Sequence, residues 1–256
     1  MLAETTNRVA LFATCLVDLY RPSVGLASAE LLERAGFRVE VPETQTCCGQ
    51  PAWNSGDNRR AKILARQTIN ALAGFDYVVI PSGSCAGTLI HDYPRLFAND
   101  PEDLGAAEDL AGRTWELTRF LVEVAAVEDL DASFRHSACY HDACSGLRGL
   151  GIRRQPRQLL AAVDGLELHE IEDSEVCCGF GGTFCVKYPE ISTRLADDKL
   201  QAIRNTGAET VLAGDLGCLL QLAGRLKRNG DTIRAYHVAE ILAGMGDQPA
   251  IGEGGD

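Results

Sequence analysis

Short apolar runs alternate with amphipathic stretches along the first half of the chain. The runs at 8–16, 37–41 and 77–80 predict β-strands, and helical spacing over 23–36 and 57–74 predicts helices that each end at a glycine. Strands that alternate with helices at this interval form parallel sheets with right-handed crossovers. We therefore expect an α/β fold, with ligand sites at the carboxyl ends of the strands.

The same order returns in the second half. Strands are predicted at 133–140, 166–171 and 210–213, with helices at 153–163 and 189–205. The repeat predicts two similar Rossmann-like, three-layer halves with mostly parallel sheets, related by internal duplication.

The segment 99–128 resembles a link between the halves, with a turn at 100–103 and an amphipathic helix at 115–127. We expect domains over 1–128 and 129–246. The remaining residues, 247–256, are rich in glycine and aspartate and are expected to form a disordered tail.

Eight of the ten cysteines repeat with nearly the same spacing in the two halves. In each half, one cysteine is followed after 31 or 32 residues by Cys-Cys-Gly, and a last cysteine follows after 35 or 38 more. Soft sulfur ligands from separate loops suit zinc or an iron–sulfur cluster. The pattern thus predicts two thiolate metal sites, a first set of Cys15, Cys47, Cys48 and Cys85 and a second set of Cys144, Cys177, Cys178 and Cys218.

The spacing bears on which metal is bound. Structural zinc usually takes two close Cys-x2-4-Cys pairs, and neither set has them; the common cubane ferredoxin spacing is also missing. Adjacent cysteines on an extended backbone point to opposite faces, so both serve one centre only if the chain kinks there. Gly49 and Gly179 permit such a kink.

The pattern resembles the cysteine-rich "CCG" domain, found in duplicate in the B subunit of heterodisulfide reductases, the iron–sulfur subunit of glycolate oxidase and the lactate utilization protein A family. Residues 140–144 and 178–184 are most similar to the last of these. The resemblance covers almost the whole chain. It implies one or two [4Fe-4S] clusters held by the eight cysteines of the two sets.

Two positions depart from the heterodisulfide reductase pattern, in which the final cysteine belongs to a Cys-x-x-Cys that helps to hold a non-cubane cluster. Thr88 and Gln221 stand there in this chain. Cys185, on the glycine-rich loop of the second half, could replace the missing sulfur or be a small buried residue. Cys139 lies in a predicted strand and is expected in the core.

His141 and Asp142 precede Cys144 directly. They could form a hydrogen-bonded pair that tunes a cluster or relays a proton, or simply make an ordinary turn. The residues leave both interpretations open.

By resemblance, the chain would be an electron-transfer component of a system that oxidises L-lactate to pyruvate and allows growth on lactate. It would act with a ferredoxin-type iron–sulfur protein and a third lactate-utilization protein, as an oxidoreductase subunit rather than a complete enzyme. One alternative is the iron–sulfur subunit of a glycolate or glycerol-3-phosphate oxidase. An alternative of another class is a non-redox protein in which zinc braces the fold.

Composition limits the kinds of partner that the chain could bind and the cell compartment in which we expect it. Twenty-four basic and 36 acidic residues give a formal charge of −12 without a basic cluster, which argues against nucleic acid. No apolar run has the roughly 18 residues needed for a membrane span, so we expect no direct membrane insertion. The apolar run at 9–15 lacks the features of a signal peptide. We expect a cytoplasmic protein with reduced thiols rather than a disulfide framework.

Overall fold

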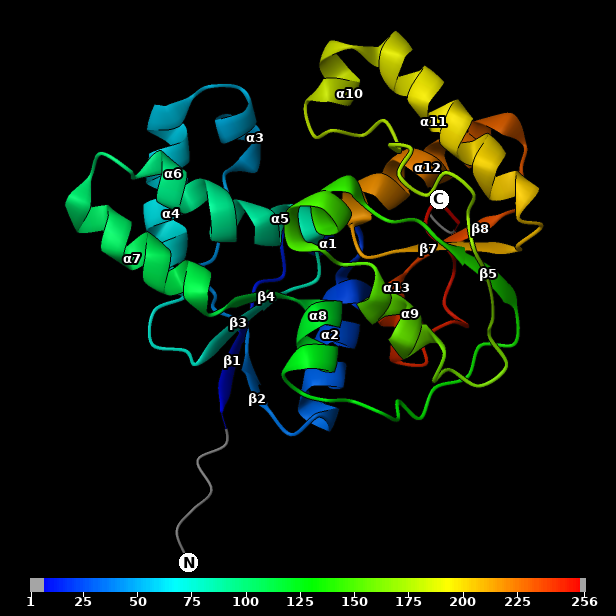
Figure 1. Ribbon diagram of the computed structural model, residues 1–256, viewed down its shortest axis with the longest axis horizontal. Coiled ribbons are helices and arrows are strands. Elements are labelled where there is room, and N and C mark those ends of the chain that lie inside the picture. Colours follow the sequence, from blue (N-terminus) through cyan, green and yellow to red (C-terminus); the bar gives the residue numbers. More distant parts are fainter. Residues whose placement is uncertain (1–6, 254–256) are drawn as a thin grey trace, which may run out of the picture. The chain divides into compact units, whose positions relative to one another are not determined.

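The computed structural model describes residues 7–253. The chain divides into two compact units, Met1–Ala126 and Val127–Asp256. The elements of both are labelled in Figure 1. The domain boundary expected after residue 128 lies two positions beyond this division.

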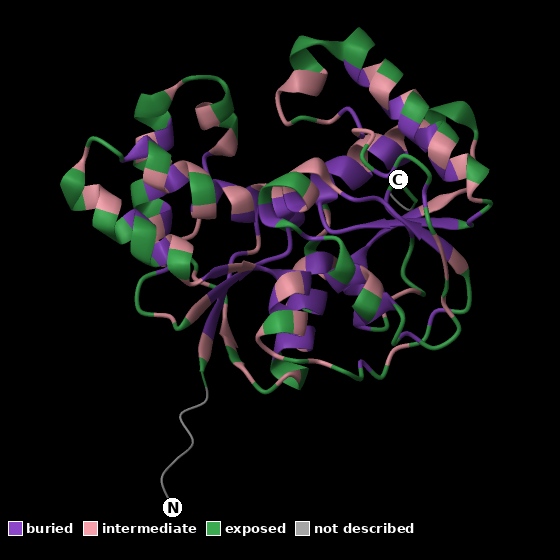
Figure 2. Ribbon diagram, in the orientation of Figure 1, coloured by how far each residue is buried: buried purple, intermediate pink, exposed green. Residues whose placement is uncertain are grey.

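The first unit is built on a sheet of four parallel strands. Their order in the sheet is β2 (Arg38–Glu40), β1 (Arg8–Leu11), β3 (Tyr77–Ile80) and β4 (Thr114–Glu116). The two central strands are apolar, and residues such as Val9 and Val79 are wholly buried. Figure 2 shows these strands in the buried colour. Burial on both faces explains why they appear in the sequence as continuous apolar runs.

Two of the helices in the first unit, α1 (Cys15–Tyr20) and α5 (Gly83–Gly87), contain a cysteine of the first set. Both begin at a side-chain cap, since the Thr14 hydroxyl accepts from the Val17 N–H and the Ser82 hydroxyl from the Cys85 N–H. The elements are α1 (Cys15–Tyr20), α2 (Pro22–Arg34), α3 (Gln50–Asn54), α4 (Asn58–Ala71), α5 (Gly83–Gly87), the π-helical turn η1 (Thr88–Asp92), α6 (Tyr93–Leu96), α7 (Pro101–Gly112) and α8 (Leu117–Glu123).

The second unit has a sheet of the same design. Its strand order is β6 (Glu167–His169), β5 (Ser137–Tyr140), β7 (Thr210–Ala213) and β8 (Arg234–His237), all parallel. Its helical elements are the π-helical turn η2 (Ser145–Gly149), α9 (Arg154–Leu160), α10 (Phe184–Lys187), α11 (Pro189–Asn205), α12 (Leu216–Asn229) and α13 (Val238–Leu242). Within residues 7–253, no helix combines the length and the apolarity that crossing a membrane requires.

The two sheets correspond strand by strand. Leu11 of β1 is paired with Val79 of β3, and Tyr140 of β5 is paired in the same way with Leu212 of β7. The next residue on each first strand continues the match. The N–H of Phe12 donates to the Val79 carbonyl at 2.9 Å, and the N–H of His141 donates to the Leu212 carbonyl at 2.7 Å. The predicted α/β class with two similar, duplicated parallel halves is confirmed.

Within the segment 99–128 the elements differ from the expected turn and helix. The predicted turn at 100–103 is the start of α7, Trp115 lies in β4, and the following helix begins only at Leu117. The fourth strand of each sheet was not predicted. Both are short and lack an apolar run, since β4 has three residues and β8 is Arg-Ala-Tyr-His.

The end of the chain differs from the expected disordered tail as far as residue 253. Ala250 and Ile251 are buried, and the Ile251 N–H donates to the Ala235 carbonyl of β8 at 2.9 Å. The Tyr236 hydroxyl donates to the Gln248 carbonyl at 2.9 Å. These contacts fasten the segment to the edge strand. Residues 254–256 of the predicted tail lie outside the described residues.

Candidate metal centres

Four of the eight repeated cysteines follow the central strands of the two sheets. Cys15 begins α1 after β1, and Cys144 lies at the equivalent place after β5. Cys85 in α5 lies five positions beyond the end of β3, as does Cys218 in α12 beyond the end of β7. Parallel strands bring their carboxyl ends to one edge of a sheet, so each unit gathers two sulfurs there.

The Cys-Cys-Gly loops bring two more sulfurs to each of these edges. They follow β2 and β6, and the glycine of each has a φ of 83°, in the left-handed region. Only glycine adopts this conformation without strain. At Gly179 a side chain is also excluded by space, because an added Cβ would lie 2.3 Å from the Ser192 carbonyl oxygen. The kink expected from sequence is present in both loops.

A hydroxyl group fastens each loop. In the first unit the Tyr93 hydroxyl donates to the Cys48 carbonyl at 2.8 Å. In the second, the Ser192 hydroxyl donates to the Gly179 carbonyl at 2.8 Å. The loops are thus held by their backbones, which leaves the cysteine side chains available as ligands.

The four thiols of the first set form one connected group. The Cys48 thiol donates to the Cys85 sulfur at 3.4 Å, and both side chains are buried. Hydrogen bonds from Cys15 and then Cys48 lower the pKa of Cys47 to about 2. The hydrogen bond to Cys47, followed by burial, holds the pKa of Cys15 well above its usual range. The hydrogen bonds thus stabilise the thiolate of Cys47 beside the thiols of Cys15 and Cys48, and a bound cation would favour the ionised form of those two as well.

The second set is assembled in a similar way. A hydrogen bond with Cys177, followed by burial, raises the pKa of Cys144 above its usual range. The Gly179 N–H donates to the Cys177 sulfur at 3.3 Å. The sulfurs of Cys178 and Cys218 lie within 4.8 Å of each other, on the buried side of the group. All eight predicted ligands therefore fall into the two expected groups.

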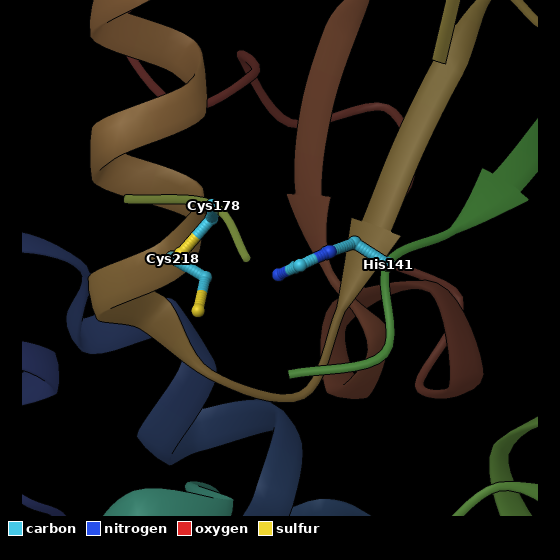
Figure 3. A group of neighbouring side chains, drawn as sticks. All are labelled: His141, Cys178 and Cys218. Carbon is cyan, nitrogen blue, oxygen red and sulfur yellow. The ribbon is translucent and has the colours of Figure 1, made fainter. Parts of the chain in front are cut away.

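A histidine joins the second set. A ring nitrogen of His141 and the sulfurs of Cys178 and Cys218 all lie within 4.8 Å of one another. Figure 3 shows the imidazole pointing toward the two sulfurs from the end of its strand. The side chain is 1% exposed, and neither ring nitrogen has a hydrogen-bond partner among the described residues. Burial, and secondly the charge of Lys199, lower the pKa of His141 to about 3, so the ring is neutral.

The donor atoms of both groups fit a metal centre that takes soft ligands. Four thiols gathered at one sheet edge supply the ligands that iron–sulfur clusters and zinc use. In the second group, the buried and unpaired nitrogens of His141 are the kind of polar atoms that a metal satisfies. The coarse prediction of cysteine-based metal sites is thereby supported, whereas the type of metal is a separate question.

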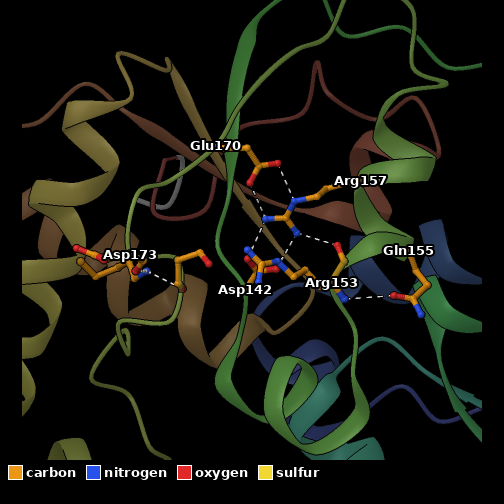
Figure 4. Close-up of polar contacts among 8 residues, drawn as sticks. Asp142, Arg153, Gln155, Arg157, Glu170 and Asp173 are labelled. Carbon is orange, nitrogen blue, oxygen red and sulfur yellow. Dashed lines mark hydrogen bonds and ion pairs between the residues drawn. The ribbon is translucent and has the colours of Figure 1, made fainter.

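Asp142 is not the partner of His141. Its side chain is wholly buried and accepts two hydrogen bonds from the Arg157 guanidinium, both at 2.9 Å. Arg157 also binds Glu170 (Figure 4). Its guanidinium lies over the ring of Tyr140. Consecutive residues of an extended segment point to opposite sides. His141 is therefore directed to the sulfurs and Asp142 to the arginine, so the predicted hydrogen-bonded pair is absent from the described residues.

Comparison with known proteins identifies the family. Residues 9–90 and 138–223 match the model of the CCG cysteine-rich domain, one match in each unit. The chain belongs to the CCG cysteine-rich domain family. Both matches span the complete set of four cysteines in their unit, so the resemblance seen in the sequence is confirmed.

Several relatives match this chain over nearly their whole length. Proteins named lactate utilization protein A are 48% identical in Geobacillus kaustophilus, with 92% of this chain and 98% of that protein covered, and 49% identical in Shouchella clausii, with 91% and 98% covered. The protein of that name from Bacillus subtilis is 45% identical, with 92% and 98% covered.

A solved structure shares the fold. The crystal structure of a hypothetical protein from Helicobacter pylori superposes with a TM-score of 0.61 at 13% identity, over 94% of this chain and 49% of that chain. This chain thus spans about half the length of that protein. At so low an identity, the likeness concerns the fold alone.

The two positions that depart from the heterodisulfide reductase pattern have structural partners in this CCG protein. The Thr88 hydroxyl, at the start of η1, donates to the Ser84 carbonyl of the preceding helix α5 at 3.0 Å. The Gln221 amide donates to the Ser192 hydroxyl at 3.0 Å, and so supports the residue that fastens the second Cys-Cys-Gly loop. Gln221 therefore serves the loop where a further sulfur would otherwise stand.

The two cysteines outside the CCG repeat have different surroundings. Cys139 lies in β5 with no exposed surface, and burial raises its pKa to about 11, which confirms the expected core position. The Cys185 thiol donates to the Gly182 carbonyl of its own loop at 3.2 Å. It is half-buried, and its role as an extra ligand stays a prediction.

Two residues that shape the second CCG site were missed from the sequence. Lys199 is wholly buried on α11 and donates to the carbonyls of Ser174 and Asp173 at 3.0 and 3.4 Å. The Phe180 ring lies against Gly217, where an added Cβ would be 2.4 Å from a ring carbon. The sequence could have indicated Lys199, because this lysine lies on the apolar face of the helix predicted at 189–205.

Proposed function

We propose that this chain is the iron–sulfur, electron-transferring component of a system that oxidises L-lactate to pyruvate. The carrying observation is the pair of four-cysteine groups, each gathered at the carboxyl edge of a parallel sheet. The names of relatives 45 to 49% identical over nearly their full length support the link to lactate utilization.

In this proposal each set of four cysteines binds one [4Fe-4S] cluster. Such a cluster, when bound, supplies reversible one-electron chemistry. The four cysteines that would hold the cluster in the first unit differ in solvent exposure. Cys48 is 2% exposed and Cys85 9%, so the protein excludes water on that side, while Cys15 and Cys47 are half-buried. The second set repeats this division, with Cys144 and Cys177 on the accessible side. Electrons would enter and leave through that side.

The lactate-binding step is assigned to another protein of the system. A cavity of about 370 Å³ lies beside Cys15 and Cys47, but the charged residues that line it are Asp18 and Glu43, and no lining residue is basic. A larger hollow of about 610 Å³ lies at the amino ends of the second sheet, away from the eight repeated cysteines. Its lining includes Arg135, but that guanidinium is paired with Asp164 at 3.2 Å. Arg157 already binds two carboxylates. Binding of a lactate carboxylate requires a cationic side chain that is not already paired, and neither cavity supplies one.

An electron-transfer role therefore implies partners. A ferredoxin-type iron–sulfur protein and a third lactate-utilization protein would supply the substrate site and the electron acceptor. The acidic balance of this chain, −12, favours basic docking surfaces on such partners.

Zinc is the second candidate for one of the two sites. The observation that favours it is His141 beside Cys178 and Cys218, because three cysteines and one histidine are a common structural zinc set. In that case the second unit would be braced by its metal, and electrons would pass only through the first.

The test is iron and acid-labile sulfide per chain in anaerobically prepared protein, with electron paramagnetic resonance spectra before and after dithionite. About eight of each per chain supports two four-iron clusters, and about four supports one. Zinc without sulfide would refute the redox proposal.

The link to lactate is tested in cells. A strain that lacks this protein should fail to grow on L-lactate and recover with the wild-type gene, but not with Cys48→Ser. Cys139→Ala, outside both sets, is the matched control and should restore growth. Normal growth of the deletion strain on L-lactate would refute the assignment even if the clusters are present.

A further inference from the structure

The duplication identifies one position at which the two sites differ in chemistry. Phe12 and His141 each follow the first strand of their sheet, and their N–H groups donate to the paired residues Val79 and Leu212. Both side chains are buried, at 0% and 1% exposure. The first unit thus places a phenyl ring where the second places an imidazole.

The imidazole has no structural partner that would explain its burial. Neither nitrogen of His141 is hydrogen-bonded within the described part of the chain. The adjacent carboxylate, Asp142, is held by Arg157 on the other side of the segment (Figure 4). A buried polar group without a partner is unfavourable, and phenylalanine at the equivalent position shows that the fold does not need a nitrogen there.

The ring instead points at the second cysteine group. A His141 nitrogen and the sulfurs of Cys178 and Cys218 lie within 4.8 Å of one another (Figure 3). These three side chains form the buried half of the group, opposite the more accessible Cys144 and Cys177. A metal beside the two sulfurs would be within reach of the nitrogen, and it would satisfy the unpaired atom.

We propose that His141 is a nitrogen ligand of the metal centre in the second unit, so that the two centres have different donor sets. The inference rests on the proposed iron–sulfur function and adds a residue outside the eight cysteines. A [4Fe-4S] cluster has one outer ligand position per iron, so His141 would take the place of one cysteine of the second set. A neutral imidazole there leaves the centre less negative and easier to reduce, as histidine ligands do in Rieske clusters. The second centre would then have the higher reduction potential of the two.

The experiment observes the ligand directly. The full-length Cys48→Ser variant, which should keep only the second centre, is prepared anaerobically with natural or ¹⁵N-labelled histidine and reduced with dithionite. Pulsed electron paramagnetic resonance should show a strongly coupled nitrogen whose signal changes with the histidine label. Because labelling alters no side chain, this arm does not depend on how a His141 variant folds.

Substitutions then identify the histidine. His141→Phe, which copies the first unit, should abolish the nitrogen coupling, and His141→Cys should replace it with a lower-potential centre. His136→Phe, an exposed histidine of the same unit, should leave coupling and potential unchanged.

The two proposals fail in different ways. Normal iron and sulfide without any histidine coupling, or a coupling that survives in His141→Phe, overturns the inference and leaves the proposed function intact. Absence of iron and sulfide from the wild-type chain overturns the proposed function itself.

Discussion

The two units of this protein have the same strand order and the same four-cysteine arrangement, yet their sites have different surroundings. In the first unit, the buried side chain at the position equivalent to His141 is the apolar ring of Phe12. The sulfurs of the second unit have the unpaired imidazole of His141 and the buried cation of Lys199 near them. Burial lowers the pKa of Lys199, and nearby Asp142 and Cys178 oppose that shift. The four-cysteine arrangement is the same in both units, whereas the residues behind it differ and make the two positions chemically distinct.

The largest expected effect tests whether the two centres are independent. Cys85→Ser and Cys218→Ser each remove one buried sulfur from one unit. Each variant should lose about half of the iron and sulfide and keep the spectrum of the other centre, because the two sets share no residue. Iron and sulfide analysis of both variants checks this. Loss of all iron in either variant would break the comparison, since it would mean that the units bind metal together.

The next effect concerns the ion pair that only the second unit has behind its first strand. Arg157→Met would leave the wholly buried carboxylate of Asp142 without its bidentate partner, at a cost of about 3–5 kcal/mol. Ala13 occupies the equivalent place in the first unit. Urea unfolding should show the loss. Arg66→Met, which breaks the exposed pair with Asp103, is the control and should change stability little; equal losses would contradict the argument.

A smaller effect separates the two Cys-Cys-Gly loops. Both glycines have a φ of 83°, so alanine costs roughly 1–2 kcal/mol of strain at either position. At Gly179 the added Cβ would also meet the Ser192 carbonyl at 2.3 Å, whereas at Gly49 it meets the Leu64 Cβ at 3.3 Å. Gly179→Ala should therefore be the less stable variant and bind less iron. Denaturation midpoints and iron content measure this, and a more damaging Gly49→Ala would reverse the expected order.

The smallest predicted effect concerns one aspartate–arginine pair in each unit, and both pairs should respond to pH in the same way. Hydrogen bonds from Arg204 and Arg66 lower the pKa values of Asp231 and Asp103 below the ordinary 3.8. A lowered carboxyl pKa contributes stability above the ordinary value, and this is lost as pH falls through the folded-state pKa. Asp231→Asn should therefore cost at most about 1 kcal/mol at pH 7, and the difference from wild type should vanish under acid conditions.

Asp103→Asn should follow the same course. Urea midpoints of both variants and the wild type, measured at pH 7 and again near pH 3, supply the test. A difference that grows on acidification would show that the sign is wrong.

The framework of the sites was predictable because it depends on residue type and spacing. Cysteines after short apolar runs indicate ligands at strand ends, and glycine after a cysteine pair indicates a kink. The edge strands β4 and β8 were not predictable in this way. Pairing with a neighbour that is distant in sequence makes Thr114–Glu116 a strand, rather than any pattern of its own.

The surroundings of the sites depended on side-chain direction, which adjacency in sequence conceals. His141 and Asp142 suggested a hydrogen-bonded pair, but the extended backbone sends them to opposite sides. Lys199 is distant in sequence from the second set and comes near it only because α11 packs its apolar face inward. Phe12 gave no signal at all until the register of the two sheets aligned it with His141.

The unequal exposure of the first four sulfurs has a consequence for damage by oxidants. Cys47 is half-buried, and hydrogen bonds from Cys15 and then Cys48 lower its pKa, so it is favoured as a thiolate in the metal-free site. Thiolates react with peroxide far faster than thiols do, and the solvent exposure of the sulfur also sets the rate of oxidation. Oxidation of the metal-free first unit would therefore begin at Cys47 and proceed inward, while Cys48 and Cys85 stay shielded. A single sulfenic acid there can still be reduced by a thiol, so this first step of oxidation is reversible.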